Sequence, residues 1–450
     1  MRLRTFTALF FISAARVLAG IGTAGQVPSF DELVLQGRAA FLVSDLDRAE
    51  AAYNKACPAE LVGEFPVAKA VTCENLLASV DEARGNLSRA EQRYLHAVAG
   101  AEQAGPAYRP LYCARLIDLG EHYRRQGELD KAETTFLRAV ELARTIGAER
   151  PILLPEALIR LGGAYADSAQ PERGRASLME ALTLIDAGAD LQMTEGAYAH
   201  DRLGIIELAA GHQHEAESHL RQSVALATEA FGEDHPVTAA YQTNLALTLI
   251  VAREFDRAAI LLRRAQFIVE SQPNPPGSEL AAIYAEMSEV SSVEGKTATA
   301  EDYALRAISI LNMQPKPDVR AAAAAEVTLA EIYLRSHDTA SAEKILPHAV
   351  EAQRRSATNA GTLAVSTELL GDLRAQQRNW QAAEGLYREA LALREKCRST
   401  AIDPTIGPLL RALADTLKHE GKSKDEIRSL EAQARGTRHA SASAPTAPPG

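Results

Sequence analysis

The sequence predicts an all-α protein built as a solenoid of about ten antiparallel helical hairpins. Three observations predict this fold. Small residues recur every 41 to 43 residues along most of the chain, apolar residues around them follow a helical period, and glycine or proline interrupts the pattern between segments. A fixed period of this length indicates stacked repeats, because one such unit cannot bury its apolar face alone.

The column of small residues sets the register of the repeats. A bulky residue follows these small residues by four positions, except at Ala304, and a second small residue follows three positions later, as in Ala132, Phe136 and Ala139. Positions three and four apart share one face of a helix, so each column marks the second helix of a hairpin. The column consists of Ala49, Ala90, Ala132, Gly174, Ala216, Ala258, Ala300, Ala342 and Ala383, and Glu426 continues it with a large polar residue.

The first helix of each hairpin carries a column of its own. Twelve residues before the first column lies another small residue, for example Gly120, Gly204 and Gly371, and each of these three follows a leucine. Small residues allow two helices to approach closely, and the bulky residues fill the space beside them. Each repeat is therefore predicted to pair two helices along these columns.

These columns resemble those of the tetratricopeptide repeat. The spacing of 42 residues exceeds the usual length of about 34 and is similar to the kinesin light chain variety. The linker FGEDHP (231–236) and the following TNLA (243–246) carry that similarity most clearly. The resemblance covers about residues 30 to 435 and implies a right-handed superhelix whose first helices line a concave groove for a protein or an extended peptide. We assign residues 26–435 to this solenoid.

The two ends of the chain differ from the array in composition. Residues 1–25 contain a basic start, an apolar run of 11 residues (5–15) and then small residues, which is the order of a secretory signal peptide. A run of that length is too short to span a bilayer. We therefore expect a periplasmic or secreted protein without a stable membrane span after signal removal, tethered to the membrane only if the signal is not cleaved. Residues 436–450 have the composition of a disordered tail.

The four cysteines, Cys57, Cys73, Cys113 and Cys397, are too few for a disulfide framework. Cys57 ends one predicted helix and Cys73 lies near the start of the next, so antiparallel packing brings them close. Two interpretations stay open for this pair: a disulfide suited to an oxidising compartment, or two buried thiols that act as small apolar side chains.

The sequence contains no motif that indicates catalysis. In GHQHEAESH (211–219), His214 and His219 lie five positions apart, about 140° around a helix, and so do not form the zinc-binding pair of H-E-x-x-H. Phosphate-binding glycine loops and G-x-S-x-G are absent. We predict no catalytic, cofactor-binding or metal-binding residues, and hence not an enzyme. A net charge of −11 without a basic block argues against a nucleic-acid partner.

The inner register of the resemblance selects a candidate groove. Its middle is apolar and its flanks are charged, which is typical of a recognition surface with a polar rim; alternatively, these residues pack inside a tightening superhelix. We predict a non-enzymatic scaffold that docks a partner there, or else a structural component that self-associates, and the sequence identifies neither the partner nor the oligomeric state. The groove residues are Ile117, Glu121, Arg124, Arg125, Tyr198, Asp201, Ile205, Leu208, Thr243, Leu247, Ile250, Val251, Glu331 and Arg335.

Overall fold

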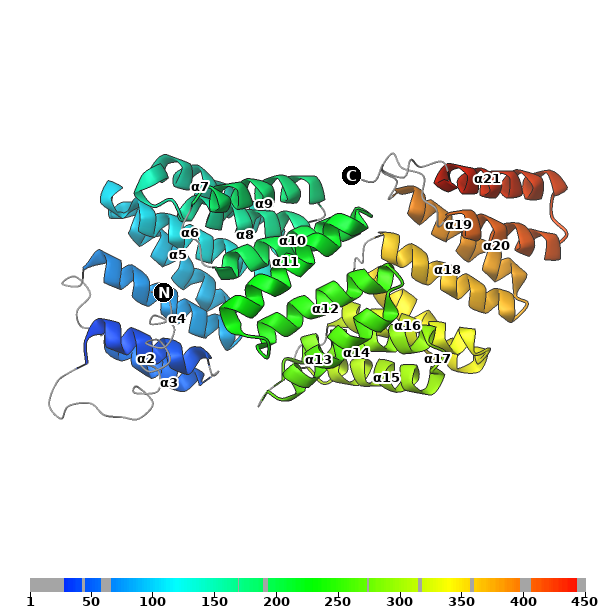
Figure 1. The fold of residues 1–450 in the computed structure, drawn as a ribbon, viewed down its shortest axis with the longest axis horizontal. Coiled ribbons are helices and arrows are strands. Elements are labelled where there is room, and N and C mark those ends of the chain that lie inside the picture. The colour runs from blue at the N-terminus through cyan, green and yellow to red at the C-terminus, as the bar shows by residue number, and fades with distance from the viewer. Residues whose placement is uncertain are drawn as a thin grey trace. The chain divides into compact units, whose positions relative to one another are not determined.

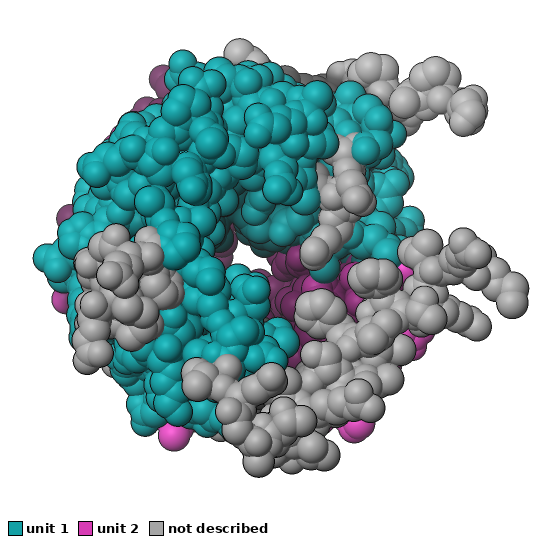
Figure 2. Space-filling model, turned by 90° about the vertical axis from the view of Figure 1, so that its left-hand side faces the viewer, with its two compact units in different colours: residues 1–226 teal, residues 227–450 magenta. Residues whose placement is uncertain are grey.

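The structure, a computed structural model, describes residues 28–42, 45–57, 66–168, 170–188, 193–272, 275–314, 318–356, 360–396 and 406–442. These residues form α-helices joined by short turns, and none of them lies in a strand (Figure 1). The chain divides into two compact units, residues 1–226 and 227–450 (Figure 2). The predicted signal peptide (1–25) lies outside the described residues.

The helices alternate as the first and second members of ten hairpins, so the all-α repeat fold is confirmed. Even numbers mark first helices and odd numbers mark second helices. Unit 1 contains α2 (Phe30–Leu42), α3 (Leu46–Ala56), α4 (Val67–Ala83), α5 (Leu87–Gln103), α6 (Arg109–Arg125), α7 (Leu129–Ile146), α8 (Leu153–Asp167), α9 (Pro171–Asp186) and α10 (Met193–Ala209). The boundary between the units falls within α11 (Gln213–Phe231). Unit 2 contains α12 (Pro236–Val251), α13 (Phe255–Glu270), α14 (Gly277–Val293), α15 (Thr297–Asn312), α16 (Val319–Arg335), α17 (Thr339–Arg355), α18 (Ala360–Gln376), α19 (Trp380–Lys396), α20 (Ile406–His419) and α21 (Lys424–Ala442).

The columns of small residues form the contact between the two helices of a hairpin. Every alanine of the second-helix column is fully buried. In the first helix, a Cβ added to Gly120 would lie 2.5 Å from the ring of Phe136, and one added to Gly371 would lie 2.6 Å from the ring of Tyr387. The bulky residue of the second helix therefore occupies the space that the small residue of the first helix leaves open.

One position in the turn inside a hairpin has a left-handed backbone, and it is glycine in some hairpins of both units, including Gly295 and Gly421 of unit 2. Gly127 ends the turn after α6 with a φ of 75°, and the backbone N–H of Glu128 returns to the carbonyl of Tyr123 at 2.9 Å. The same register position in unit 2 is Arg253, His337 or Arg378 in three hairpins, with φ of 62°, 61° and 59°. Side chains with a Cβ carry a steric cost in this left-handed region, whereas glycine does not.

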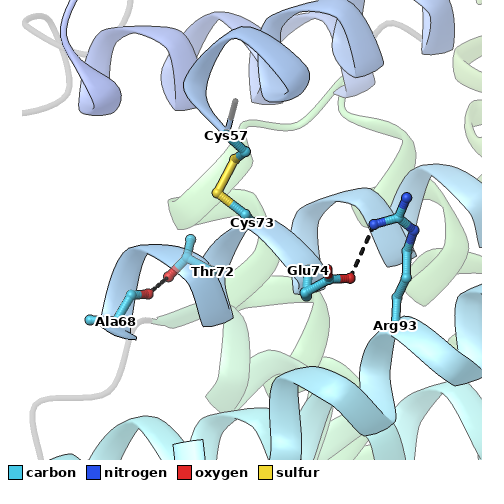
Figure 3. The surroundings of a disulfide bond; sticks show 6 residues. All are labelled: Cys57, Ala68, Thr72, Cys73, Glu74 and Arg93. Carbon is cyan, nitrogen blue, oxygen red and sulfur yellow. Dashed lines mark hydrogen bonds and ion pairs between the residues drawn. A yellow bond between two sulfur atoms is a disulfide. The ribbon is translucent and has the colours of Figure 1, made fainter. Parts of the chain in front are cut away.

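A disulfide joins the first two hairpins of unit 1. Cys57, directly after α3, is bonded to Cys73 in α4, with the two Cα atoms 5.9 Å apart (Figure 3). Of the two interpretations left open by the sequence, the structure contains the disulfide. Cys113 is a buried free thiol whose pKa burial raises to about 12, and Cys397 lies outside the described residues.

The C-terminal helix is longer than the sequence suggested. We expected the disordered tail to start at residue 436, but α21 continues to Ala442. No proline interrupts residues 436–442, and the next proline comes only at position 445. Residues 443–450 lie outside the described residues. Within the described residues, no helix is long and apolar enough to cross a bilayer.

Candidate functional site

The predicted groove residues all lie on first helices. They belong to α6 and α10 in unit 1 and to α12 and α16 in unit 2. Each unit therefore presents a face of its own, which we call the inner face of that unit: the side of its first helices that carries these register positions.

Two of the predicted groove residues are not available to a partner. Asp201 is fully buried and pairs with Arg202 at 2.7 Å, and Ile250 is only 4% exposed. Their assignment as contact residues does not fit the structure, because both side chains are buried. Ile117 is also 4% exposed, but it reaches the floor of a pocket on the inner face of unit 1.

This pocket has a volume of about 570 Å³. Most of its wall comes from the first helices α4, α6 and α8, and Figure 2 shows unit 1 curving around a hollow. Glu121 and Arg125, both predicted groove residues, lie on its wall. The lining residues are Phe41, Ser79, Glu82, Ala83, Tyr94, Ile117, Asp118, Glu121, Arg125, Glu156 and Arg160.

Glu82 is the centre of a charge network in this pocket. Its carboxylate accepts hydrogen bonds from Arg125 Nη2 at 2.6 Å and lies 2.8 Å from His122 Nδ1. Burial alone would raise the pKa of Glu82, but the hydrogen bonds from His122 and Arg125 outweigh it and lower the pKa to about 2. This carboxylate is therefore charged and compensated by its own chain.

The other arginines of the inner face of unit 1 are paired in the same way. Arg124 lies 3.1 Å from Glu121 and 2.7 Å from Asp167, which joins α6 to the end of α8. Arg160 in α8 lies 2.8 Å from Glu195 in α10. These pairs link successive first helices, and they leave the face nearly balanced in charge.

Some polar groups on the inner face of unit 1 remain unsatisfied. Asn75 Oδ1 and Tyr198 OH are shielded from solvent and have no hydrogen-bond partner among the described residues. Tyr198 lies beneath two guanidinium groups, with its ring centre 5.2 Å from Arg160 and 5.4 Å from Arg202. Buried polar groups normally have partners, so these two atoms are exceptions on this face.

The inner face of unit 2 carries a regular column of acids. Glu289 in α14, Glu331 in α16 and Asp372 in α18 each follow directly the small-column residue of their helix. We call these three residues the acidic column. Sequence reasoning selected only Glu331; the shared register, one acid per repeat in three successive repeats, is the signal that could have identified Glu289 and Asp372. Asp415 continues the register on α20, where it pairs with Lys418 at 2.9 Å.

Several of these carboxyl groups hold their protons more tightly than usual. Burial, followed by the neighbouring Glu289, raises the pKa of Glu286 to about 8. Burial and then Glu331 raise the pKa of Glu289. Burial also raises the pKa of Asp372, although a 2.7 Å hydrogen bond from the Tyr387 hydroxyl opposes that rise. These shifts indicate that burial, together with neighbouring acids, disfavours the charged form of these carboxyl groups.

The cations near the acidic column are already engaged. Arg335 hydrogen-bonds Glu331 and also donates to Ser292 Oγ at 2.9 Å. Arg394 lies 2.6 Å from Glu368, the acid one turn before Asp372. Neither Glu286 nor Glu289 forms an ion pair with another residue that the structure describes.

The apolar part of the predicted groove is divided between two helices. On α12, Thr243 and Leu247 are half-buried and Val251 is 56% exposed. On α10, Ile205 and Leu208 are half-buried. These positions give each unit a small apolar surface on a first helix.

The histidines of the GHQHEAESH segment do not gather in one place. His219 stacks on His200 of α10, with the two Nδ1 atoms 3.0 Å apart, and burial followed by the charge of His219 lowers the pKa of His200 to about 4. His212 instead lies 2.7 Å from Glu207. In the described part of the chain, no three His, Cys, Asp or Glu side chains are arranged to hold a metal ion.

Comparison with known proteins gives a family match. The model of a family described as tetratricopeptide repeat matches residues 70–145, 194–271 and 320–396, together more than half of the chain. These segments begin and end close to the bounds of α4–α7, α10–α13 and α16–α19. No curated protein matches the chain.

Solved structures are similar to this chain at low sequence identity, and two Rap proteins share its fold. The apo form of RapI is 13% identical, with 82% of this chain and 98% of RapI covered and a TM-score of 0.57. A Rap protein complexed with Competence and Sporulation Factor is 14% identical, with the same coverage and TM-score. A putative kinesin light chain from Podosopora anserina with nearly identical TPR-like repeats is 18% identical and covers 46% of this chain and 97% of its own, with a TM-score of 0.38.

Proposed function

Since the chain belongs to the tetratricopeptide repeat family, we propose that it is a non-enzymatic scaffold that binds a protein or an extended peptide along its first helices. The observation that carries this proposal is the pocket of about 570 Å³ on the inner face of unit 1, lined by three successive first helices. Shielded polar atoms without partners, Asn75 Oδ1 and Tyr198 OH, lie on the same face.

We also propose that the protein acts outside the cytoplasm, in the periplasm or beyond the cell. The order of basic, apolar and small residues in residues 1–25 supports this proposal. The Cys57–Cys73 disulfide supports it independently, because disulfides persist in oxidising compartments.

Site-specific photocrosslinking in cells tests the docking surface. A photoreactive residue at Arg125 or Val251, on first helices, should capture a defined partner, whereas one at Met179 or Ile260, on second helices, should not. Leu247→Glu with Val251→Glu should then abolish capture at Val251 and leave the helical circular dichroism unchanged. Capture from the second-helix positions alone contradicts docking on the inner faces.

A second candidate function is self-association through the second helices. Leu95, Leu137 and Met179 are exposed and recur at one register position, 42 residues apart, on α5, α7 and α9 of unit 1. Phe267 on α13 is 72% exposed. Apolar surface of this kind favours an interface with another copy. Light scattering should then give a mass that rises with concentration, and Met179→Glu should abolish that rise.

A further inference from the structure

We propose that the acidic column of unit 2, together with Glu286, binds an extended peptide segment that carries arginine or lysine at about every third residue. This inference rests on the proposed function and names the chemistry of the partner.

The acids are placed at regular intervals along one face. Each lies on a different first helix, and the 2.9 Å contact between Arg335 Nη1 of α16 and Ser292 Oγ of α14 places these helices side by side on that face. The helices α16 and α18 also contact each other. Packed helices lie about 8–10 Å apart. An extended chain advances about 3.3–3.6 Å per residue, so successive acids correspond to about three residues of peptide.

The negative charge of this face is not balanced by cations of the described residues. Arg335 compensates Glu331 but leaves Glu286, Glu289 and Asp372 without an ion-pair partner in the part of the chain that the structure describes. Oε2 of Glu286 is shielded from solvent and receives no hydrogen bond. Holding the Glu286 carboxyl group in such a position is costly unless a donor reaches it. A guanidinium or ammonium group supplies both the donors and the opposite charge.

Unit 1 shows that the repeat can provide this compensation itself. There Glu121 occupies the register position of Glu289, and Arg124 of the same helix pairs with it at 3.1 Å. The residues that correspond to Arg124 and Arg125 on α14 are Ser292 and Val293, which carry no charge. A binding partner would therefore supply the cations that α14 lacks.

Fluorescence anisotropy with the full chain tests the inference. The probe is a labelled peptide of repeated Arg-Ser-Ser triplets, and the comparison peptide has glutamate in place of arginine. The arginine peptide should bind, more weakly at about 300 mM salt than at about 50 mM, and the glutamate peptide should not. Absence of arginine-peptide binding overturns the inference.

Matched variants separate the acidic column from general attraction to an acidic protein. Glu289→Gln with Asp372→Asn should weaken binding about tenfold or more, because each removes a charged acceptor. Glu351→Gln with Glu395→Gln removes the same charge from the second helices α17 and α19 and should change binding less than about twofold. Equal weakening in both variants overturns the inference, and so does displacement of the peptide by an equimolar concentration of spermine.

The two proposals fail differently. If Glu289→Gln with Asp372→Asn leaves arginine-peptide binding unchanged while Val251 still captures its partner, the acidic column is not the contact and the scaffold function stands. If photoreactive residues at Arg125 and Val251 both fail to capture a partner, and the arginine peptide does not bind, both proposals are wrong.

Discussion

Glu82 on the inner face of unit 1 and Glu286 on the inner face of unit 2 are held in opposite circumstances. Burial also raises the pKa of Asp118 and Glu156 in unit 1, so the contrast concerns these two residues and not the whole faces. In unit 1, Glu82 accepts from Arg125 and lies beside His122, and its pKa falls to about 2. In unit 2, Glu286 has no such partner among the described residues, and burial, followed by Glu289, raises its pKa to about 8. The same residue type, at register positions six residues apart, therefore stabilises the fold in one unit and is costly to ionise in the other. The neighbouring side chains therefore decide whether an acid stabilises the fold.

The disulfide gives unit 1 a covalent link between hairpins for which the described part of unit 2 shows no counterpart. Cys57→Ser with Cys73→Ser should cost about 3 kcal/mol, because the bond closes a loop with a sequence separation of 16. Hydrogen exchange should accelerate in α2 to α4 and remain unchanged in α14 to α19. Acceleration throughout both units would show that the units do not unfold separately.

A larger side chain in the hairpin core should lower the stability of both units by a similar amount. Ala132→Leu in unit 1 and Ala300→Leu in unit 2 each overpack a fully buried position and should cost about 1–3 kcal/mol, measured by denaturant unfolding. As a control, Ala210→Leu changes an exposed residue after α10 and should have little effect. If either buried substitution leaves stability untouched, the register of that unit is incorrect.

Substitutions at the left-handed turn position should change the stability of the protein in opposite directions. Gly127→Ala in unit 1 places a Cβ in the left-handed region and should cost about 1 kcal/mol, whereas Arg378→Gly in unit 2 should gain up to about 1 kcal/mol. Thermal unfolding of the two variants measures both effects. A loss of stability in Arg378→Gly would mean that its side chain makes contacts that outweigh the backbone strain.

The hairpins could be predicted from sequence because their columns follow from sterics that act over neighbouring helices. Gly120 and Phe136 are twelve and four residues from Ala132, and this spacing alone places them in contact. The exposure of the inner face was harder to predict, since Asp201 and Ile250 share the periodicity of the groove but pack inward. The Cys57–Cys73 bond stayed open because spacing does not fix the distance between two sulfur atoms. The acidic column was visible in the register, but its lack of cations depends on side-chain positions.

The pH dependence of stability in Glu82→Gln and Glu286→Gln tests the contrast between these two carboxyl groups most directly. The folded pKa of Glu82 lies below its ordinary value of 4.5, so its contribution to stability is present above that pH and is lost as the pH falls toward about 2. The folded pKa of Glu286 lies above 4.5, with Glu289 as the neighbouring charge, so unit 2 loses stability as the pH rises from about 4.5 to about 8.

Thermal unfolding of Glu82→Gln and Glu286→Gln at about pH 5 and about pH 8 gives the result. We expect Glu82→Gln to be less stable than the parent at both pH values. We expect Glu286→Gln to be close to the parent at the lower pH and more stable than the parent at the higher pH. A loss of stability in Glu286→Gln at the higher pH would show that its carboxylate is compensated within the chain, and would contradict the account.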